Sequence, residues 1–314
     1  MGHKKAKPDT PEPWLWLPWH WPAWLAAGLL WSSSRLPWRA RLAVGRALGR
    51  LTRGMAGKRR RVAARNLALC LPDTPATERE QLLRDHFESL GIGLMEMAMA
   101  WWTPAHRLPP VEVCGMEHLE AAREQGKGVI LLSPHFTTLE ISGRLLLEHM
   151  QGIPRPMYRP LDNPVLESIV AGNRRRLFGD LIPRDNIRSL VRLLRRGEVV
   201  WYAPDQSYRG KQSAMVDFFG IPAPTNTGTS RLAAMTGAPV VPFFVQRLGD
   251  TRGYRLHLWP ALEDFPGADP VADSLRVNHI FERQISHCPE QYWWVHQRFK
   301  KRPPEYPDLY RNVD

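Results

Sequence analysis

The chain has 314 residues, of which 43% are hydrophobic, enough for the core of one large domain with a short appendage. Its formal net charge of +12 at pH 7 indicates an anionic partner, which would be a nucleic acid, an acidic lipid or an acidic protein. The three cysteines form no C-x-x-C pair, and the sequence contains no G-x-S-x-G, Walker or G-x-G-x-x-G motif and no cluster with metal-ligand spacing. A disulfide scaffold, a serine-hydrolase elbow, a nucleotide-binding loop and a metal site are therefore not expected.

Residues 1–12 are polar and rich in lysine and proline, a composition that predicts a disordered tail. Residues 13–34 contain no Asp, Glu, Lys or Arg, and they hold six of the 13 tryptophans. As one helix this stretch would extend about 33 Å, enough to cross a hydrocarbon core. Pro18, His20 and Pro22 interrupt its first half, and indole rings favour the headgroup zone. We predict an uncleaved membrane-anchor helix within residues 13–37 that spans or re-enters the bilayer. This interpretation is preferred to a soluble hydrophobic hairpin.

An arginine-rich segment, residues 35–65, follows directly and is almost free of acidic residues. Positive charge beside an apolar segment places the rest of the chain, a single domain over residues 38–314, on the cytoplasmic side of a membrane. Leucine and glycine alternate with the arginines, as in a basic amphipathic helix that lies on anionic lipid. A nucleic-acid-binding arm would carry similar charge. The neighbouring tryptophans favour lipid, so we predict no nucleic acid partner.

Helical and strand-like patterns alternate along the rest of the chain, which predicts an α/β fold with a mixed central sheet flanked by helices. A long helix is expected over Thr77–Met99 with Thr77 as its N-cap. Its methionine-rich end is typical of a protein core and would also suit an acyl tunnel. Further helices are expected at residues 117–125, 161–177, 186–196 and 271–288, and strands at residues 111–114, 129–132, 156–159, 199–203, 239–245 and 255–259.

One stretch, Gly128–Met150, joins a buried strand at residues 129–132 to a helix that starts near Thr137. His135 therefore lies on a strand-to-helix turn at the carboxyl end of a buried strand, where open α/β sheets place ligands. A histidine just before the first turn of the helix can fold back towards Glu140, so the spacing suits a pair in this strand-turn-helix setting. A carboxylate that fixes the tautomer of an imidazole makes that imidazole a general base for a hydroxyl. By spacing alone, however, such a His-x4-Glu pair is expected by chance in a chain of this composition.

Five motifs then follow in order: HFTTLE from His135, YRPLDNP from Tyr158, VVWYAPDQSY from Val199, TGTSRLA from Thr227 and PEQYWWVHQRFKKRP from Pro289. Together they resemble the lipid A biosynthesis acyltransferases, in particular the lauroyl-type late acyltransferases of Gram-negative inner membranes, over about residues 19–303. The resemblance implies a glycerolipid acyltransferase-like fold. It also implies transfer of a fatty acyl chain, lauroyl or similar, from acyl carrier protein to a hydroxyl of a lipid A precursor, an anionic glycolipid, at the cytoplasmic face of the inner membrane. No cofactor is implied beyond the acyl thioester donor.

The resemblance adds Arg174 and Asp205, which match functional positions of the family, to His135 and Glu140. A guanidinium at Arg174 suits a phosphate of the acceptor or the oxyanion of the thioester, and Asp205 could orient Arg174 or bond a sugar hydroxyl. Arg159 ends the strand predicted at residues 156–159 and is a candidate for substrate contact. Each of these three also has a structural reading, as a solvated helix end, a loop cap or an ion-pair partner.

Two more features are candidate binding elements. The helix start at Thr227–Ser230 offers backbone N–H groups to an anion. A basic C-terminal patch is formed by His296, Arg298, Lys300, Lys301 and Arg302, and a plain solvated surface explains it equally well. Four of its members are candidate contacts for the acidic acyl carrier protein: Arg298, Lys300, Lys301 and Arg302.

Alternative functions remain open from the sequence. The His-x4-acid turn is shared with glycerolipid and amino-lipid O-acyltransferases, so the acceptor is not fixed by it. A catalytically silent membrane scaffold would keep the fold, but the intact His135 and Glu140 argue against it. A basic nucleic-acid-binding protein would show steep salt-dependent affinity for DNA in the absence of lipid.

Overall fold

The computed structural model describes residues 13–184, 186–249, 252–311 and 313. The predicted disordered tail, residues 1–12, lies outside the described residues. Cys70, Cys114 and Cys288 are all free thiols.

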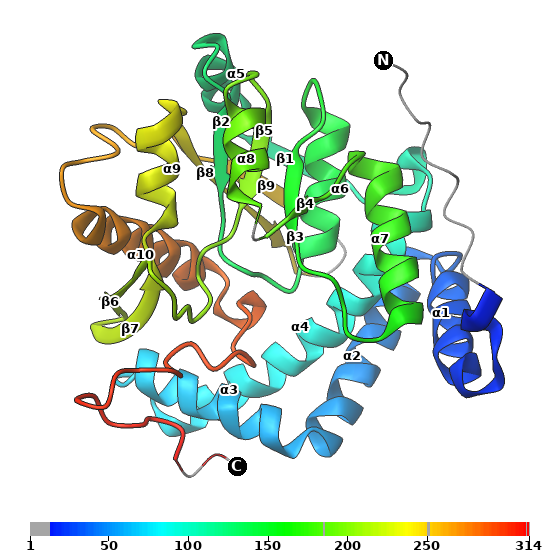
Figure 1. Cartoon of the computed structure of the whole chain (residues 1–314). Helices are drawn as coiled ribbons and strands as arrows, with labels where there is room; N and C mark the ends of the chain where they lie inside the picture. The colour runs from blue at the N-terminus through cyan, green and yellow to red at the C-terminus, as the bar shows by residue number, and fades with distance from the viewer. Residues whose placement is uncertain (1–12, 185, 250–251, 312, 314) are drawn as a thin grey trace.

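The described residues form a seven-stranded sheet with the strand order β1-β9-β8-β2-β5-β3-β4 (Figure 1). All neighbouring strands are parallel except β8 and β9, so the prediction of an α/β fold with a mixed sheet is confirmed. The strands are β1 (Val111–Cys114), β2 (Val129–Leu132), β3 (Arg155–Tyr158), β4 (Ile182–Pro183), β5 (Val199–Tyr202), β8 (Val240–Arg247) and β9 (Tyr254–Leu258).

Strands β2 and β5 are parallel partners at the middle of the sheet, and every residue in both is buried. Alternate side chains enter different cores, because successive residues of a strand point to opposite faces. Ile130 and Val200 join one core cluster, whereas Leu131 and Trp201 join the other. The carboxyl ends of β2 and β5 consequently meet at the same edge of the sheet.

Three helices form a layer below the sheet in the view of Figure 1: α2 (Trp38–Met55), α3 (Gly57–Cys70) and α4 (Ala76–Trp102). The long helix predicted over Thr77–Met99 is present as α4, but it begins one residue earlier, with Pro75 at the N-cap position. The prediction that Thr77 caps this helix was therefore wrong. Pro75 is already extended before the first turn, as a residue outside the helix should be.

The other helices surround the sheet, and three of them begin at a side chain that caps the helix. Asn163 accepts hydrogen bonds from the backbone N–H groups of Val165 and Leu166, so it opens α7 as the sequence indicates. Asn186 caps α8 in the same way through Ser189. These helices are α5 (Met116–Glu124), α6 (Leu139–His149), α7 (Pro164–Phe178), α8 (Ile187–Leu194), α9 (Gly228–Thr236) and α10 (Pro270–His287), with two single turns, η3 (Ala105–Arg107) and η4 (Pro289–Gln291).

A β-hairpin formed by β6 (Ser213–Phe218) and β7 (Ile221–Asn226) was not predicted, because the sequence there resembles a polar loop and a proline-rich turn. Pro222 and Pro224 lie within β7. Proline cannot donate to a ladder, but an edge strand tolerates it, and this two-stranded sheet consists only of edges. The two-residue strand β4 also escaped prediction, since so short a segment has no readable periodicity.

The uncharged N-terminal stretch bends back on itself through η1 (Pro13–Trp16), η2 (Pro18–His20) and α1 (Trp21–Ser33). The indole of Trp24 donates to the carbonyl of Leu15 at 2.8 Å and stacks on Trp16 with ring centroids 4.3 Å apart. The predicted single long helix is thus broken. In the described part of the chain, no helix has the length and apolarity to cross a membrane.

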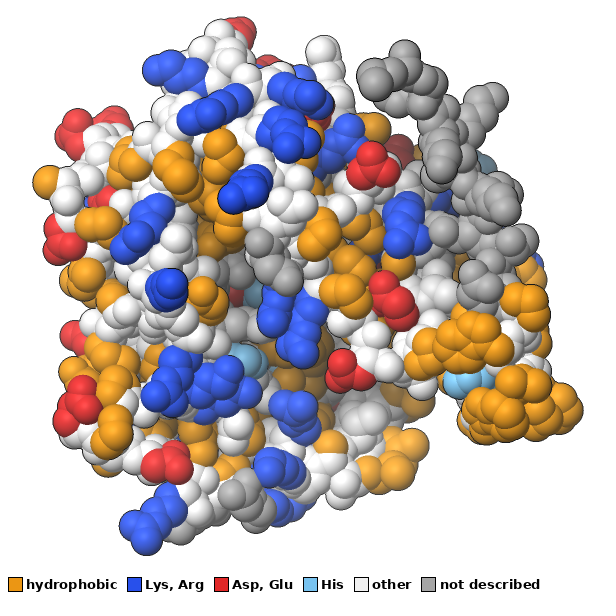
Figure 2. Space-filling model, viewed as in Figure 1, with side chains coloured by type: hydrophobic (Ala, Val, Ile, Leu, Met, Phe, Trp, Pro, Cys, Tyr) orange, Lys and Arg blue, Asp and Glu red, His pale blue; other side chains and the backbone are white. Residues whose placement is uncertain are grey.

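Large apolar side chains nevertheless cluster on the outside of this N-terminal unit, where Figure 2 shows a protruding group of hydrophobic residues. Trp19 is 69% exposed. The exposed members of the unit are Trp14, Trp16, Leu17, Trp19, Trp21, Leu25, Leu29 and Trp31.

The arginines of α3 are exposed, and three of them also contact the C-terminal part of the chain. The guanidinium groups of Arg59, Arg61 and Arg65 donate to the backbone carbonyls of Val295, Val313 and Leu309. Arginines thus serve as clamps for the C-terminal segment, residues 292–313. On α2, Arg46 and Arg50 contact Glu88 of α4.

Helices α2 and α4 approach each other closely at glycines, which gives a stability prediction. A Cβ at Gly49 would lie 2.1 Å from the carbonyl oxygen of Phe87, whereas a Cβ at Gly54 on the same helix would meet nothing within 4 Å. Gly49→Ala should lower the free energy of unfolding by about 1 to 3 kcal/mol through overpacking. Gly54→Ala should raise it by about 0.5 to 1 kcal/mol, since alanine favours the helix. Urea denaturation followed by tryptophan fluorescence in detergent measures both, and equal midpoints would contradict the prediction.

Candidate active site

His135 lies beyond the carboxyl end of β2, on the turn that leads into α6, as the sequence predicted. The structure pairs it with Asp205, which follows β5. The Oδ2 atom of Asp205 accepts a hydrogen bond from the backbone N–H of His135 at 2.9 Å, and its Oδ1 atom lies 2.5 Å from Nδ1 of the ring. The side chain of Asp205 is only 2% exposed, whereas that of His135 is 24% exposed. A buried carboxylate therefore fixes the ring while one ring edge reaches solvent.

Electrostatics favour an ionised Asp205 beside His135. Burial raises the pKa of Asp205, but the charge and the two hydrogen bonds of His135 outweigh burial and leave that pKa below its ordinary value. Burial lowers the pKa of His135, and the charge and hydrogen bond of Asp205 more than offset it, so the pKa of His135 is raised. Since a carboxylate only accepts, Nδ1 carries the proton in the neutral ring and Nε2 presents a lone pair.

The predicted contact between Glu140 and His135 is wrong in this structure. Glu140 lies in the first turn of α6, where its Oε1 atom accepts from Nε of Arg174 at 3.0 Å and also from the Nη2 atom of Arg174. Its Oε2 atom accepts from the indole of Trp101 at 3.0 Å. Within the described residues, no hydrogen bond joins Glu140 to His135. The helix directs Glu140 towards α7 and α4, and the distant Asp205 takes the role that the spacing had suggested for Glu140.

Arg174, on α7, is the second predicted site residue that the structure brings to this edge. Its guanidinium also lies over the ring of Tyr158, with the Cζ atom 5.2 Å from the ring centroid. The positive charge of Arg174 lies close enough to His135 to oppose protonation of the imidazole. The prediction that Asp205 orients Arg174 is replaced by two separate pairs, His135 with Asp205 and Arg174 with Glu140.

A second histidine at this edge was missed as a site residue, because the sequence presents it within a run of basic residues. The Nε2 atom of His296 accepts a hydrogen bond from the backbone N–H of Ser207 at 3.1 Å. Burial lowers the pKa of His296 to about 4, with a smaller opposing effect from Asp205 and further lowering by Lys300 and His135. His296 is therefore neutral near pH 7, and it holds the loop that follows Asp205.

The basic C-terminal patch divides into buried and accessible members. Arg298 is 2% exposed and donates to the carbonyl of Pro224 and to the hydroxyl of Thr225, so it cannot be a surface contact as predicted. Partial burial and the positive charges of Lys301, Arg59 and Arg159 lower the pKa of Lys300. The charge of Arg159, which directly follows β3, therefore acts on Lys300. Like-charged side chains from the end of β3, from α3 and from the C-terminal segment lie near one another there.

Several groups at the helix start Thr227–Ser230 are used by contacts within the protein, whereas the buried hydroxyl of Thr229 has no hydrogen-bond partner among the described residues. The backbone N–H of Gly228 donates to Asn226, the hydroxyl of Thr227 donates to the carbonyl of Gln212, and the hydroxyl of Ser230 donates to the buried Asp273. These bonds give the start of α9 a structural role in the described structure.

The two pairs predict different effects on the titration of His135. Asp205→Asn removes the charge that raises the pKa of His135, so that pKa should fall by roughly 1 to 3 pH units. Glu140→Gln should change it less, because Glu140 contacts Arg174 rather than the imidazole. NMR titration of histidine-labelled protein measures both, with a His135→Gln sample to assign the resonance. A larger fall in Glu140→Gln than in Asp205→Asn would contradict the assignment of the pair.

Comparison with known proteins identifies the family of the chain. The sequence profile of the family described as bacterial lipid A biosynthesis acyltransferase matches residues 11–301. The chain is 38% identical over 295 residues to the lipid A biosynthesis lauroyltransferase of Escherichia coli K12, covering 93% of this chain and 96% of that protein. It is 36% identical over 298 residues to the lipid A biosynthesis palmitoleoyltransferase of the same strain, covering 93% and 95%, respectively. A lipid A biosynthesis acyltransferase of Haemophilus influenzae is 34% identical over 313 residues, covering 98% of this chain and 99% of that protein. The chain belongs to the bacterial lipid A biosynthesis acyltransferase family.

Proposed function

We propose that the protein transfers a fatty acyl chain from an acyl carrier protein thioester to a hydroxyl of a lipid A precursor. The observation that carries the proposal is the His135–Asp205 pair at the carboxyl edge of the sheet, in a chain of this family. A hydroxyl is too weak an acid to attack a thioester unaided at pH 7, so it needs a positioned base. His135, with Nδ1 held by a buried carboxylate and Nε2 presented, has the required form.

In the proposed step, Nε2 of His135 takes the proton from the acceptor hydroxyl as the oxygen attacks the thioester carbonyl carbon. The C–O bond forms, the C–S bond breaks, and the proton held by His135 passes to the leaving thiolate. Asp205 stabilises the imidazolium that exists between these two transfers. The raised pKa of His135 suits its task as a base, because an imidazole that is too weakly basic would not take the proton from the hydroxyl.

Arg174 is proposed to stabilise the oxyanion that develops on the thioester carbonyl. Its guanidinium is fixed by Glu140 and by the face of Tyr158, so little reorganisation is needed when charge appears. Glu140 is then a positioning residue, acting through Arg174. Arg159, in the basic group around Lys300, is proposed to contact substrate phosphate.

The acceptor oxygen is proposed to be the nucleophile, without a covalent acyl-enzyme. Burial raises the pKa of the Cys70 and Cys288 thiols, so neither is a thiolate at neutral pH. Cys114 lies on β1, at the far edge of the sheet from β2. A general base that acts directly on the acceptor accounts for the reaction without any of them.

The protein is proposed to act at the cytoplasmic face of the inner membrane. The exposed tryptophans of the N-terminal unit favour the headgroup zone, and Arg35 and Arg39 follow immediately in the chain. An interfacial position would bring the site close to an amphipathic glycolipid acceptor.

Removal of the base tests the catalytic proposal. His135→Ala should reduce the single-turnover rate of acyl transfer by about 10²- to 10⁴-fold, the usual contribution of a positioned general base. Lipid mass spectrometry of a host lacking the gene should show lipid A with one acyl chain fewer, restored by the wild-type gene and not by the His135→Ala gene. Unchanged lipid A in the deletion strain, together with a changed glycerolipid or amino-lipid, would contradict the proposed acceptor.

Charge predicts the choice of donor. Acyl carrier protein is acidic, so a basic surface should speed its encounter in a salt-dependent way. The double variant Lys300→Gln/Lys301→Gln should lower kcat/KM for an acyl carrier protein thioester by about 10-fold at low salt, and less at high salt. Lys127→Gln, which lies before β2 at the opposite end of that strand, is the matched control. Equal kcat/KM for acyl carrier protein and coenzyme A thioesters, insensitive to salt, would contradict the prediction.

A further inference from the structure

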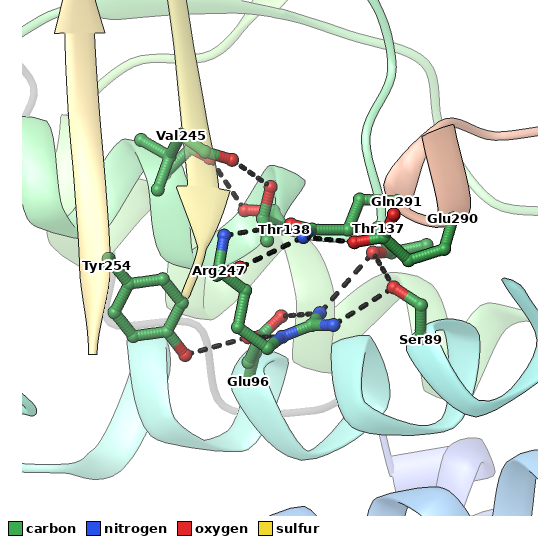
Figure 3. A network of polar contacts seen from close by, with 10 residues as sticks. Ser89, Glu96, Thr137, Thr138, Val245, Arg247, Tyr254, Glu290 and Gln291 are labelled. Atoms are coloured by element: carbon green, nitrogen blue, oxygen red, sulfur yellow. Dashed lines mark hydrogen bonds and ion pairs between the residues drawn. The ribbon is translucent and has the colours of Figure 1, made fainter. Parts of the chain in front are cut away.

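A buried ion pair, Glu96 with Arg247, lies beside Thr137, two residues after His135 in the chain (Figure 3). Arg247, the last residue of β8, donates from Nε to Oε1 of Glu96 at 2.6 Å and from Nη2 to Oε2 at 2.8 Å. The side chain of Glu96 is fully buried and that of Arg247 is 8% exposed. The hydroxyl of Tyr254 donates to the same carboxylate at 2.7 Å. None of these residues touches the His135–Asp205 pair directly, and the proposed chemistry does not use them.

The guanidinium of Arg247 reaches from this pair to the turn that carries His135. Its Nη1 atom donates to the hydroxyl of Ser89 at 2.9 Å, and its Nη2 atom donates to the hydroxyl of Thr137 at 3.3 Å. The two hydroxyls lie 2.7 Å apart and bond each other. Thr137 is two residues after His135, so the hydrogen bonds of the charged pair on α4 and β8 extend to the turn that carries His135.

Gln291 connects the same arginine to the other side of the turn. Its Oε1 atom accepts from the backbone N–H of Arg247 at 2.8 Å, and its Nε2 atom donates to the backbone carbonyl of Arg247 at 3.0 Å. The backbone carbonyl of Gln291 then accepts from the N–H of Thr137 at 2.7 Å. The N–H of Trp293 donates to the carbonyl of His135 at 3.0 Å. The peptide groups on both sides of Phe136 are thereby fixed.

We propose that the Glu96–Arg247 pair, through Ser89, Thr137 and Gln291, is a positioning device that sets the imidazole of His135 against Asp205. The inference depends on the proposed role of His135 as general base. Hydrogen bonds fix direction as well as distance, and a guanidinium held by a bidentate carboxylate presents its remaining N–H groups in one orientation. The backbone of α4 adds a steric limit, since a Cβ at Gly93 would lie 2.5 Å from the carbonyl of Thr137.

Two mild variants test the device without breaking the ion pair. Thr137→Val and Ser89→Ala remove the hydroxyls that transmit the arrangement and keep the side-chain volume nearly unchanged. Each should lower kcat by about 10- to 100-fold with KM for donor and acceptor unchanged, the size expected for a misplaced catalytic group. The acidic limb of the pH–rate profile should move to lower pH, because a loosened contact with Asp205 no longer raises the pKa of His135.

Matched variants separate positioning from general destabilisation. Ser274→Ala removes another buried helical hydroxyl, in α10, and should leave kcat and the pH profile unchanged. Arg247→Lys keeps the charge without the bidentate fork and should behave like Thr137→Val. The double variant Glu96→Leu/Arg247→Met should regain thermal stability relative to either single variant while kcat stays low. A purely structural pair would instead let kcat recover together with stability.

The outcomes distinguish this inference from the proposed function. Near-wild-type transfer by His135→Ala would remove the proposed function and this inference together. A different result would overturn the positioning device alone. In that case His135→Ala would be inactive, while Thr137→Val and Ser89→Ala would keep the wild-type kcat and the wild-type pH–rate profile.

Discussion

The buried ion pair of Glu96 and Arg247 is the interaction that joins the separate layers of the fold. Removing either charge from water is expensive, and only the other charge and its additional hydrogen bonds offset that cost. Loss of one partner would leave an uncompensated buried charge, which typically costs about 3 to 5 kcal/mol. Because α4, β8, β9 and the His135 turn all supply groups to this cluster, they must be assembled together for it to form.

The strand-turn-helix unit around His135 could be read from the sequence, but its acidic partner could not. The apolar run Val129–Leu132 and the helical spacing after Thr137 are local signals, and both elements are present. These local signals favour Glu140, the nearest acid in sequence, as the partner, although α6 turns it towards Arg174. Asp205 is 70 residues away and meets His135 only because β2 and β5 are parallel neighbours. Knowledge of the strand order would have predicted the pair, since the carboxyl ends of neighbouring parallel strands share an edge.

The hydrogen-bond partners of the arginines in residues 35–65 could not be predicted from the sequence either. Charge spacing in residues 35–65 fits a helix on a lipid surface, yet Arg59, Arg61 and Arg65 bond carbonyls more than 200 residues away in sequence. Every residue has a backbone carbonyl, and the carbonyl is uncharged. The positions of acidic residues in the sequence therefore could not predict these partners. These three arginines stay exposed, so they hold the C-terminal segment and still add to the positive surface.

That clamp has a consequence for how the enzyme is made. The carbonyl of His135 is bonded by Trp293, and the C-terminal segment is held in turn by Asn66 of α3 through the carbonyls of Trp294 and His296. At about 5 to 20 residues per second, a ribosome completes this segment roughly 10 to 30 s after it has made His135. During that interval the nascent chain has its histidine but lacks the contacts that fix it. Acyl transfer should therefore begin only after translation of the chain is nearly complete, when its N-terminal tryptophans have long been available to a membrane.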